Sequence, residues 1–311
     1  MDKRLFLSWL KIIFYPLYYL YKKIRYKYAQ KNPKKWADRR YKNKFGRFID
    51  WNNPTEFNEK IRWMQFNTDT TMWSLLADKY GVRKYLEENG YGHILVKLYG
   101  KWDKAKDIDF DSLPNSFILK TNHGYGEIII VKDKSKVNIE QVRRKMQKYL
   151  DTPFGVLSAE PHYLRIKPCI IAEELLVQDG GLSKSLIDYK FYCFSGVPDA
   201  CGVFYDRDVL LHENGMTPYD MNWNKHEEWR RKDLKTPFKN IPKPKTFDLM
   251  KQACKDLASQ FPFVRMDFYE VNGKLYFGEF TFTPAALSGG SYNKAVMKNW
   301  GDRIDINNIC I

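Results

Sequence analysis

Short apolar runs bounded by turn-forming residues alternate along the chain with segments whose apolar residues recur at helical spacing. The short runs predict strands at 94–102, 117–119, 128–131 and 169–177, a strand pair over 186–206, and a hairpin over 263–284. Helical spacing predicts helices beginning after 53–55, over 72–90 with a break at Gly81, over 139–149 and over 247–261. Because strands and helices follow no strict βαβ repetition, the predicted fold class is α+β. The polar, aromatic segment 206–245 is predicted to be an excursion from the core.

A glycine-containing turn separates the strands predicted at 117–119 and 128–131. It reads Thr-Asn-His-Gly-Tyr-Gly over 121–126, and Lys120 stands immediately before it. Such a turn leaves backbone N–H groups free to face an anion, and the lysine adds a fixed positive charge. The pattern therefore suits a lid over phosphate groups. An ordinary hairpin with a surface lysine produces the same pattern.

The hairpin over 263–284 carries a second polar group. Arg265 and Asp267 share one face of their strand, and Glu279 and Thr281 share one face of the next. A two-residue Asn-Gly turn puts Asp267 and Glu279 on opposite faces, whereas a three-residue Val-Asn-Gly loop puts all four side chains on one face. In the second geometry the carboxylates form a plausible Mg²⁺ site; the alternative is a solvated face with an Arg–Asp pair.

Asp188 and Lys190 also share one face of a strand, with Tyr189, Phe191 and Cys193 on the other. Such a strand could contact a polyphosphate, or the pair could be an ordinary ion pair of the sheet.

The net charge of +15 raises the question of a nucleic-acid partner. Residues 1–50 hold 15 Lys and Arg against 3 Asp and Glu, so the remaining chain is nearly balanced and a nucleic-acid partner is not expected. The five cysteines are scattered without a C-x-x-C pair, which predicts a reduced, cytoplasmic compartment and no zinc or disulfide framework.

The basic arm over 1–35 has an apolar segment, 5–21, that Lys11 and Pro16 interrupt and that is shorter than the about 20 residues of a membrane span. A helix here places one group of residues on one side and a second group on the other. The first is Phe6, Trp9, Leu10, Ile13, Leu17, Leu20 and Ile24, and the second is Arg4, Ser8, Lys11, Tyr15, Tyr18, Lys22 and Arg25. This pattern predicts peripheral attachment to the anionic inner face of the cytoplasmic membrane. A helix packed on the protein's own core is the alternative.

Five motifs in fixed order resemble the TupA-like ATP-grasp family of bacterial surface-polysaccharide (teichuronopeptide-type) biosynthesis. They are FNEKIRW, ADKYGVRKYL, LPNSFILKTNHGYGEIIIVKD, DYKFYCFSG and GEFTFTP, and they extend from about residue 51 to 284. The resemblance implies an ATP-grasp fold, in which two α+β subdomains clamp ATP. It divides the chain into the arm 1–35, a helical region 36–115, a lid subdomain 116–172 and a C-terminal subdomain 173–311.

The resemblance also implies site residues. Lys120, Lys190 and Arg265 have catalytic roles at the phosphates, and Asp267, Glu279 and Thr281 hold Mg²⁺. The residues implied to bind ATP are Lys120, Asn122, His123, Gly124, Gly126, Lys132, Glu173, Glu174, Leu175, Asp188 and Lys190. Thr281 departs from the pattern of many ATP-grasp enzymes, which have Asn two residues after the metal-binding glutamate. A hydroxyl can still ligate Mg²⁺, but the resemblance does not imply a second metal ion. A lone histidine such as His123 is more often structural.

The implied reaction is ADP-forming ligation. A carboxylate is activated as an acyl phosphate, and an amine or hydroxyl of a sugar, lipid-linked saccharide or amino acid then attacks it. The alternatives are a glycosyltransferase or sugar kinase of the same pathway, or a non-catalytic membrane-surface adaptor. We also hypothesise that Tyr219, Trp223, Trp229 and Arg230 shape the acceptor site.

Overall fold

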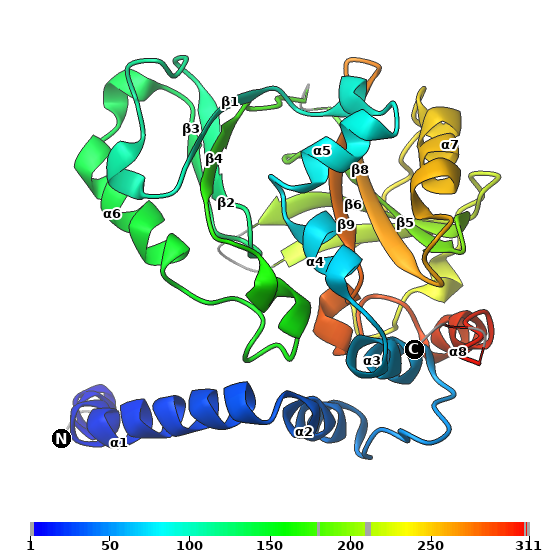
Figure 1. Cartoon of the computed structure of the whole chain (residues 1–311), viewed down its shortest axis with the longest axis horizontal. Coiled ribbons are helices and arrows are strands. Elements are labelled where there is room, and N and C mark those ends of the chain that lie inside the picture. Colours follow the sequence, from blue (N-terminus) through cyan, green and yellow to red (C-terminus); the bar gives the residue numbers. More distant parts are fainter. Residues whose placement is uncertain (1–2, 179–180, 209–212, 308, 310–311) are drawn as a thin grey trace.

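Two antiparallel sheets form the body of the molecule (Figure 1). The computed structural model describes residues 3–178, 181–208, 213–307 and 309, and the side chains of 3–15, 208 and 213 lie outside that description. The first sheet has the strand order β1-β4-β2-β3, and the second has the order β7-β6-β5-β8-β9. The predicted α+β class is confirmed.

The first sheet contains β1 (Leu98–Trp102), β2 (Phe117–Thr121), β3 (Ile128–Val131) and β4 (Ile170–Glu173). β1 lies within the strand predicted at 94–102, in the otherwise helical region 36–115, and pairs with β4. Residues of β2 alternate between a face buried under α6 (Ile139–Leu150) and a face that includes Lys120. Phe117 and Leu119 therefore pack on Met146, while Lys120 points to the opposite side.

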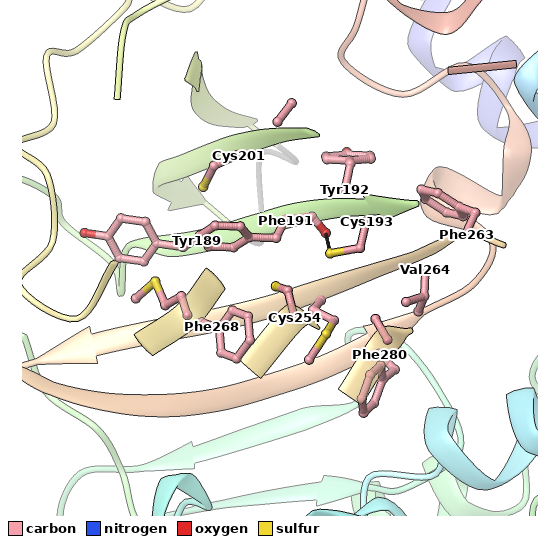
Figure 2. Close-up of a cluster of buried hydrophobic side chains, with 14 of the residues drawn as sticks. Tyr189, Phe191, Tyr192, Cys193, Cys201, Cys254, Phe263, Val264, Phe268 and Phe280 are labelled. Atoms are coloured by element: carbon pink, nitrogen blue, oxygen red, sulfur yellow. Dashed lines mark hydrogen bonds between the residues drawn. The ribbon is translucent and has the colours of Figure 1, made fainter. Parts of the chain in front are cut away.

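The second sheet contains β5 (Asp188–Phe194), β6 (Val197–Asp208), β7 (Glu213–Tyr219), β8 (Val264–Val271) and β9 (Lys274–Thr281). Helix α7 (Phe247–Ala258) covers one face. Figure 2 shows Phe191 and Cys193 of β5 in this core beside Phe268 of β8 and Cys254 of α7. The polar residues Asp188 and Lys190 consequently occupy the other face.

The prediction of an excursion over 206–245 is wrong at its beginning. β7 pairs with β6 as an edge strand, and its residues Met216 and Tyr219 are buried. Pro218 obscured the strand pattern, since proline interrupts a ladder and is tolerated at a sheet edge. The rest of this segment is mostly irregular.

The predicted helices are present. They are α3 (Phe57–Asn67), α4 (Thr71–Ala77) and α5 (Val82–Glu88), the last two separated at Gly81 as expected, together with α6 and α7. Figure 1 shows α4 and α5 in front of the second sheet, on the side of the first. Near the C-terminus, α8 (Lys294–Asp302) packs on α3.

The N-terminal arm forms α1 (Lys3–Lys31) and continues into α2 (Pro33–Phe45). Every described side chain from 16 to 24 is exposed, so this part of α1 does not pack on the protein's own core. The predicted positions Phe6, Trp9, Leu10 and Ile13 lie outside the described side chains. Among the described residues, no helix has both the length and the apolar character of a membrane span.

Candidate active site

The polar face of the second sheet brings together side chains from three neighbouring strands. Lys190 of β5 lies opposite Asp267 of β8, which lies opposite Glu279 of β9. One step along, Arg265 of β8 lies opposite Thr281 of β9. All five point to the side away from α7, as the alternation of a strand requires.

A β-bulge brings the two carboxylates to the same face. The hairpin uses the two-residue turn, with Val271 opposite Lys274 and with Asn272 and Gly273 at φ 53° and 72°. That turn alone would place Asp267 and Glu279 on opposite faces. The register shifts beyond Phe268, so that Gly278 is an extra residue on β9 and Glu279 returns to the face of Asp267.

Arg265 lies between the acidic side chains. Its Nε donates to Asp267 Oδ1 at 2.6 Å, and one terminal nitrogen reaches Glu279 Oε1 at 3.1 Å and Thr281 Oγ1 at 2.9 Å. Lys190 pairs with Asp267 and, at 2.7 Å, with Asp188. The arrangement is a compact network of alternating charges in which each buried carboxylate has a cationic partner.

The charges in this network affect the carboxylates differently. Burial raises the pKa of Asp267, which is 1% exposed, against the opposing charges of Arg265 and Lys190. Burial also acts to raise the pKa of Glu279, but Lys79, Arg265 and Lys190 outweigh it and lower that pKa to about 2. Glu279 is therefore a carboxylate anion at neutral pH.

The donor set suits a hard divalent cation. Asp267 and Glu279 supply carboxylate oxygens and Thr281 a hydroxyl, whose Oγ1 lies 3.0 Å from Glu279 Oε1. Mg²⁺ is commonly held by one or two carboxylates and completed by substrate phosphates. The side chain of Glu279 is 33% exposed, so that this edge of the network opens to a ligand.

The first sheet presents a complementary pair. Lys120 Nζ lies 2.5 Å from Glu173 Oε2, and Arg83 of α5 lies 3.4 Å from Glu173 Oε1. The backbone N–H of Glu174 donates to the Lys97 carbonyl, and Leu175 follows outside regular secondary structure. A cleft is lined by Lys120 and Glu173 on one side and by Phe277 and Gly278 of β9 on the other.

The glycine turn is held by contacts from outside the hairpin. Asn122 is buried; its Nδ2 donates to Asp78 Oδ1 and the Lys167 carbonyl, and its Oδ1 accepts from the Cys169 N–H. His123 is buried with Nε2 against the Thr152 carbonyl, and burial lowers its pKa. Both side chains thus support the loop from inside. Gly126 and Lys132 are exposed, and Gly124 is buried beside Glu127.

Four residues at or beside the site were not predicted as site residues. Lys79 Nζ donates to the Gly124 carbonyl at 2.5 Å, and Lys79 and Arg83 line the cleft. Arg207 pairs with Asp188, and burial raises the pKa of Tyr163, with Glu160 and Glu279 acting in the same direction. Lys79 and Arg83 stand four residues apart in ADKYGVRKYL, and that spacing of two cations was an available signal.

The hypothesis of an aromatic acceptor site over 206–245 finds little support. Tyr219 and Trp223 stack on each other at 4.3 Å and pack into the core. Arg230 donates to the carbonyls of Met216 and Leu234. Trp229 stacks on His226 at 4.0 Å. These side chains serve packing and backbone support.

The TupA-like ATPgrasp family model matches residues 59–305, which include every strand of both sheets. The chain belongs to the TupA-like ATP-grasp family. This membership places it among the ATP-grasp enzymes, which are ADP-forming carboxylate–amine ligases. No curated protein sequence matches it.

Solved structures of ATP-grasp ligases resemble this TupA-like protein in fold. D-alanine–D-alanine ligase from Bacillus anthracis is 15% identical, with a TM-score of 0.42 over 79% of this chain and 67% of that one. L-amino acid ligase from Bacillus licheniformis is 13% identical, with a TM-score of 0.45 over 74% of this chain and 49% of that one. D-alanine–D-alanine ligase from Helicobacter pylori is 14% identical, with a TM-score of 0.40 over 76% and 60%. This TupA-like protein thus spans from about half to two thirds of their lengths.

Proposed function

We propose that this TupA-like protein is an ATP- and Mg²⁺-dependent ligase of surface-polysaccharide biosynthesis. It activates a carboxylate as an acyl phosphate and joins it to an amine or hydroxyl of a sugar or amino-acid acceptor. One observation carries the proposal: Gly278 of the second sheet lines the same cleft as Lys120 and Glu173 of the first, and Gly278 directly precedes Glu279 of the Lys190–Asp267–Glu279 row.

In this proposal the cationic side chains bind the phosphate groups. Lys120 and Lys190 contact the triphosphate, and Arg265 stabilises the charge that develops on the transferred phosphoryl group. Glu173, Glu174 and Leu175 receive the adenine and ribose, and the loop 122–126 covers the phosphates; the N–H of Asn122 donates to the Cys169 carbonyl and is not one of the phosphate contacts. Asp188 orients Lys190, which it contacts at 2.7 Å.

Asp267, Glu279 and Thr281 would hold Mg²⁺. The ion would neutralise phosphate charge during transfer. The low pKa of Glu279 keeps this ligand ionised at neutral pH. No protein nucleophile is required, and burial raises the pKa of the thiols of Cys169, Cys201 and Cys254.

The family and α1 support the proposed acceptor and the proposed place of action. A saccharide on a lipid carrier is presented at the membrane surface, and α1 exposes apolar side chains beside cations there. Deleting residues 1–24 should therefore abolish co-sedimentation with phosphatidylglycerol vesicles. Co-sedimentation that survives the deletion would remove this part of the proposal.

Calorimetry of ATP binding with and without Mg²⁺ tests the proposal first. We expect Mg²⁺-dependent binding by the wild type, weakened at least about tenfold in Lys120→Ala and Glu279→Ala. Lys136→Ala is the matched control, because that lysine is exposed and pairs with Asp133, away from the cleft. Failure of the folded wild type to bind ATP would contradict the ligase assignment; binding would justify screening acids and amines for ADP release.

A further inference from the structure

The exposed part of α1 presents an apolar stripe that faces away from the body. Leu17, Leu20 and Ile24 are 61%, 52% and 59% exposed, and at 100° per residue they fall on one side. The contact with the body is made by Tyr26 and Ala29, which fall on a different side of the helix. Lys23 and Lys27 are exposed along one border of the stripe. Apolar side chains flanked by cations complement an anionic lipid surface.

The C-terminal end of α1 is connected to the body of the protein through contacts of α2. Arg25 of α1 lies over the Trp36 ring at 5.1 Å. Trp36 Nε1 donates to the Leu157 carbonyl at 3.0 Å, and Arg40 donates to the same carbonyl at 3.0 Å. The second terminal nitrogen of Arg40 donates to Ser288 Oγ at 2.9 Å. Arg40 thus joins the arm to two segments that are 131 residues apart.

Both segments adjoin the candidate active site. Residues 157–160 lead into the 3₁₀ turn Pro161–Arg165, which carries Tyr163, and Ser288 follows β9, which carries Glu279 and Thr281. Arg62 of α3 binds the same two segments through the carbonyls of Ala159 and Ala286. Glu160 and Thr283 share a buried hydrogen bond between them. The arm therefore connects to a polar junction directly behind β9.

The segment after β9 is conformationally strained. Ala285, Ala286 and Leu287 have φ values of 51°, 49° and 53°, which place three consecutive non-glycine residues in the left-handed region. Such residues are unfavourable and persist only where surrounding contacts hold them. Arg62 and Arg40 supply such contacts from the N-terminal part of the chain.

We propose that binding of α1 to an anionic lipid surface is transmitted through Trp36 and Arg40 to the turn 284–290, and so orders the edge of the active site formed by β9. Lipid phosphates offset the repulsion between Arg25 and Arg40, and this favours the bonds of Arg40 to Leu157 and Ser288. Burial lowers the pKa of Arg40; the charge of Glu160 opposes this shift, and the charge of Arg25 adds to it. The significance for catalysis rests on the proposed ligase activity, whereas the coupling itself rests only on the proposed binding of α1 to lipid.

Hydrogen exchange of the full chain tests the coupling without an acceptor substrate. The probes are vesicles of phosphatidylcholine with phosphatidylglycerol, and vesicles of phosphatidylcholine alone. We expect the anionic vesicles to slow exchange in 16–24 and, by at least about threefold, in 284–291 of the wild type. Arg40→Gln should keep the protection of 16–24 and lose that of 284–291.

Further variants separate the coupling from misfolding. Ser288→Ala removes the hydroxyl that accepts the hydrogen bond from Arg40, so it should have the same effect as Arg40→Gln. Arg39→Gln changes an exposed neighbouring residue on α2 and should behave as wild type. Leu20→Glu with Ile24→Glu should lose both effects. The proposal is overturned if the wild type does not bind the anionic vesicles, if protection is confined to 16–24, or if Arg40→Gln and Ser288→Ala retain protection of 284–291. Calorimetry of Mg-ATP without vesicles is independent, so either proposal can fail alone.

Discussion

The two hairpins at the cleft, β2–β3 and β8–β9, carry their polar groups in different places. In β2–β3 only Lys120 is on a strand; the other polar groups are in the loop between the strands, which contacts from Asp78, Lys79 and Thr152 hold. In β8–β9 the strands themselves carry Arg265, Asp267, Glu279 and Thr281, and the tight turn at Asn272–Gly273 lies at the far end. A loop held by a few outside contacts can open at small cost, whereas strands within a sheet keep fixed geometry. The first hairpin therefore suits a lid, and the second a rigid catalytic surface.

The largest effect is expected from Asp267→Ala in the second hairpin. It leaves Lys190 and Arg265 without the carboxylate they share, which should lower the free energy of unfolding by about 3–5 kcal/mol and abolish Mg²⁺-dependent ATP binding. Urea unfolding and calorimetry measure both effects. Asp248→Ala on the surface of α7 is the control and should change stability by less than about 0.5 kcal/mol. A stable Asp267→Ala variant that binds Mg-ATP normally would refute the rigid-surface interpretation.

Gly278→Ala tests the bulge that aligns the carboxylates. A Cβ there would lie 2.9 Å from the Asp267 carbonyl oxygen, so we expect a loss of about 1–3 kcal/mol in the free energy of unfolding and weaker Mg-ATP binding. Gly273→Ala, in the remote turn at φ 72°, should cost about 1 kcal/mol and leave ATP binding unchanged. Equal effects of the two substitutions on ATP binding would show that the bulge has no special role.

His162→Phe tests the packing next to the second hairpin, where His162 contacts Trp73 and Trp73 stacks on Phe282 after β9. Burial, reinforced by Arg165 and Arg62, lowers the pKa of His162 to about 3. Because the folded state holds the neutral form, the stability from this group is complete above pH 6.5 and is lost as the pH falls toward 3. The wild type should lose about 1.5 kcal/mol between pH 6.5 and 5 relative to His162→Phe, as measured by denaturant unfolding. The exposed His93→Phe is the control, and an identical pH slope in wild type and His162→Phe would contradict the expectation.

Gly124→Ala should have the smallest effect on stability but should clearly weaken the binding of ATP. A Cβ at Gly124 would lie 2.5 Å from Glu127 Oε2, the mobile end of a side chain, so the free energy of unfolding should change by less than about 1 kcal/mol. The displaced carboxylate should instead raise the Kd for Mg-ATP several-fold. A large loss of stability with unchanged ATP affinity would show that the loop of β2–β3 is a rigid structural element and not a lid.

Much of the fold could be predicted from the sequence because it depends on local pattern. The strand over 128–131 and the helices beginning at Ile139 and Phe247 have the predicted limits or nearly so, and Gly81 separates α4 from α5. Edge strand β7 could not be recognised in this way, because an edge strand has one partner and tolerates the proline that a central strand excludes.

The chemistry of the site was determined by residue type and order. Lys120, Lys190, Arg265, Asp267 and Glu279 lie on strands whose two-residue alternation fixes the face of each side chain, and their order matches one family. Tertiary structure decided how they meet. The bulge at Gly278 depends on the close approach of the Asp267 backbone, and Lys79 reaches the cleft from the turn between α4 and α5, which is distant in sequence. The exposure of Leu17, Leu20 and Ile24 was likewise settled only by the fold, because amphipathic spacing is the same whether a helix covers a core or a membrane.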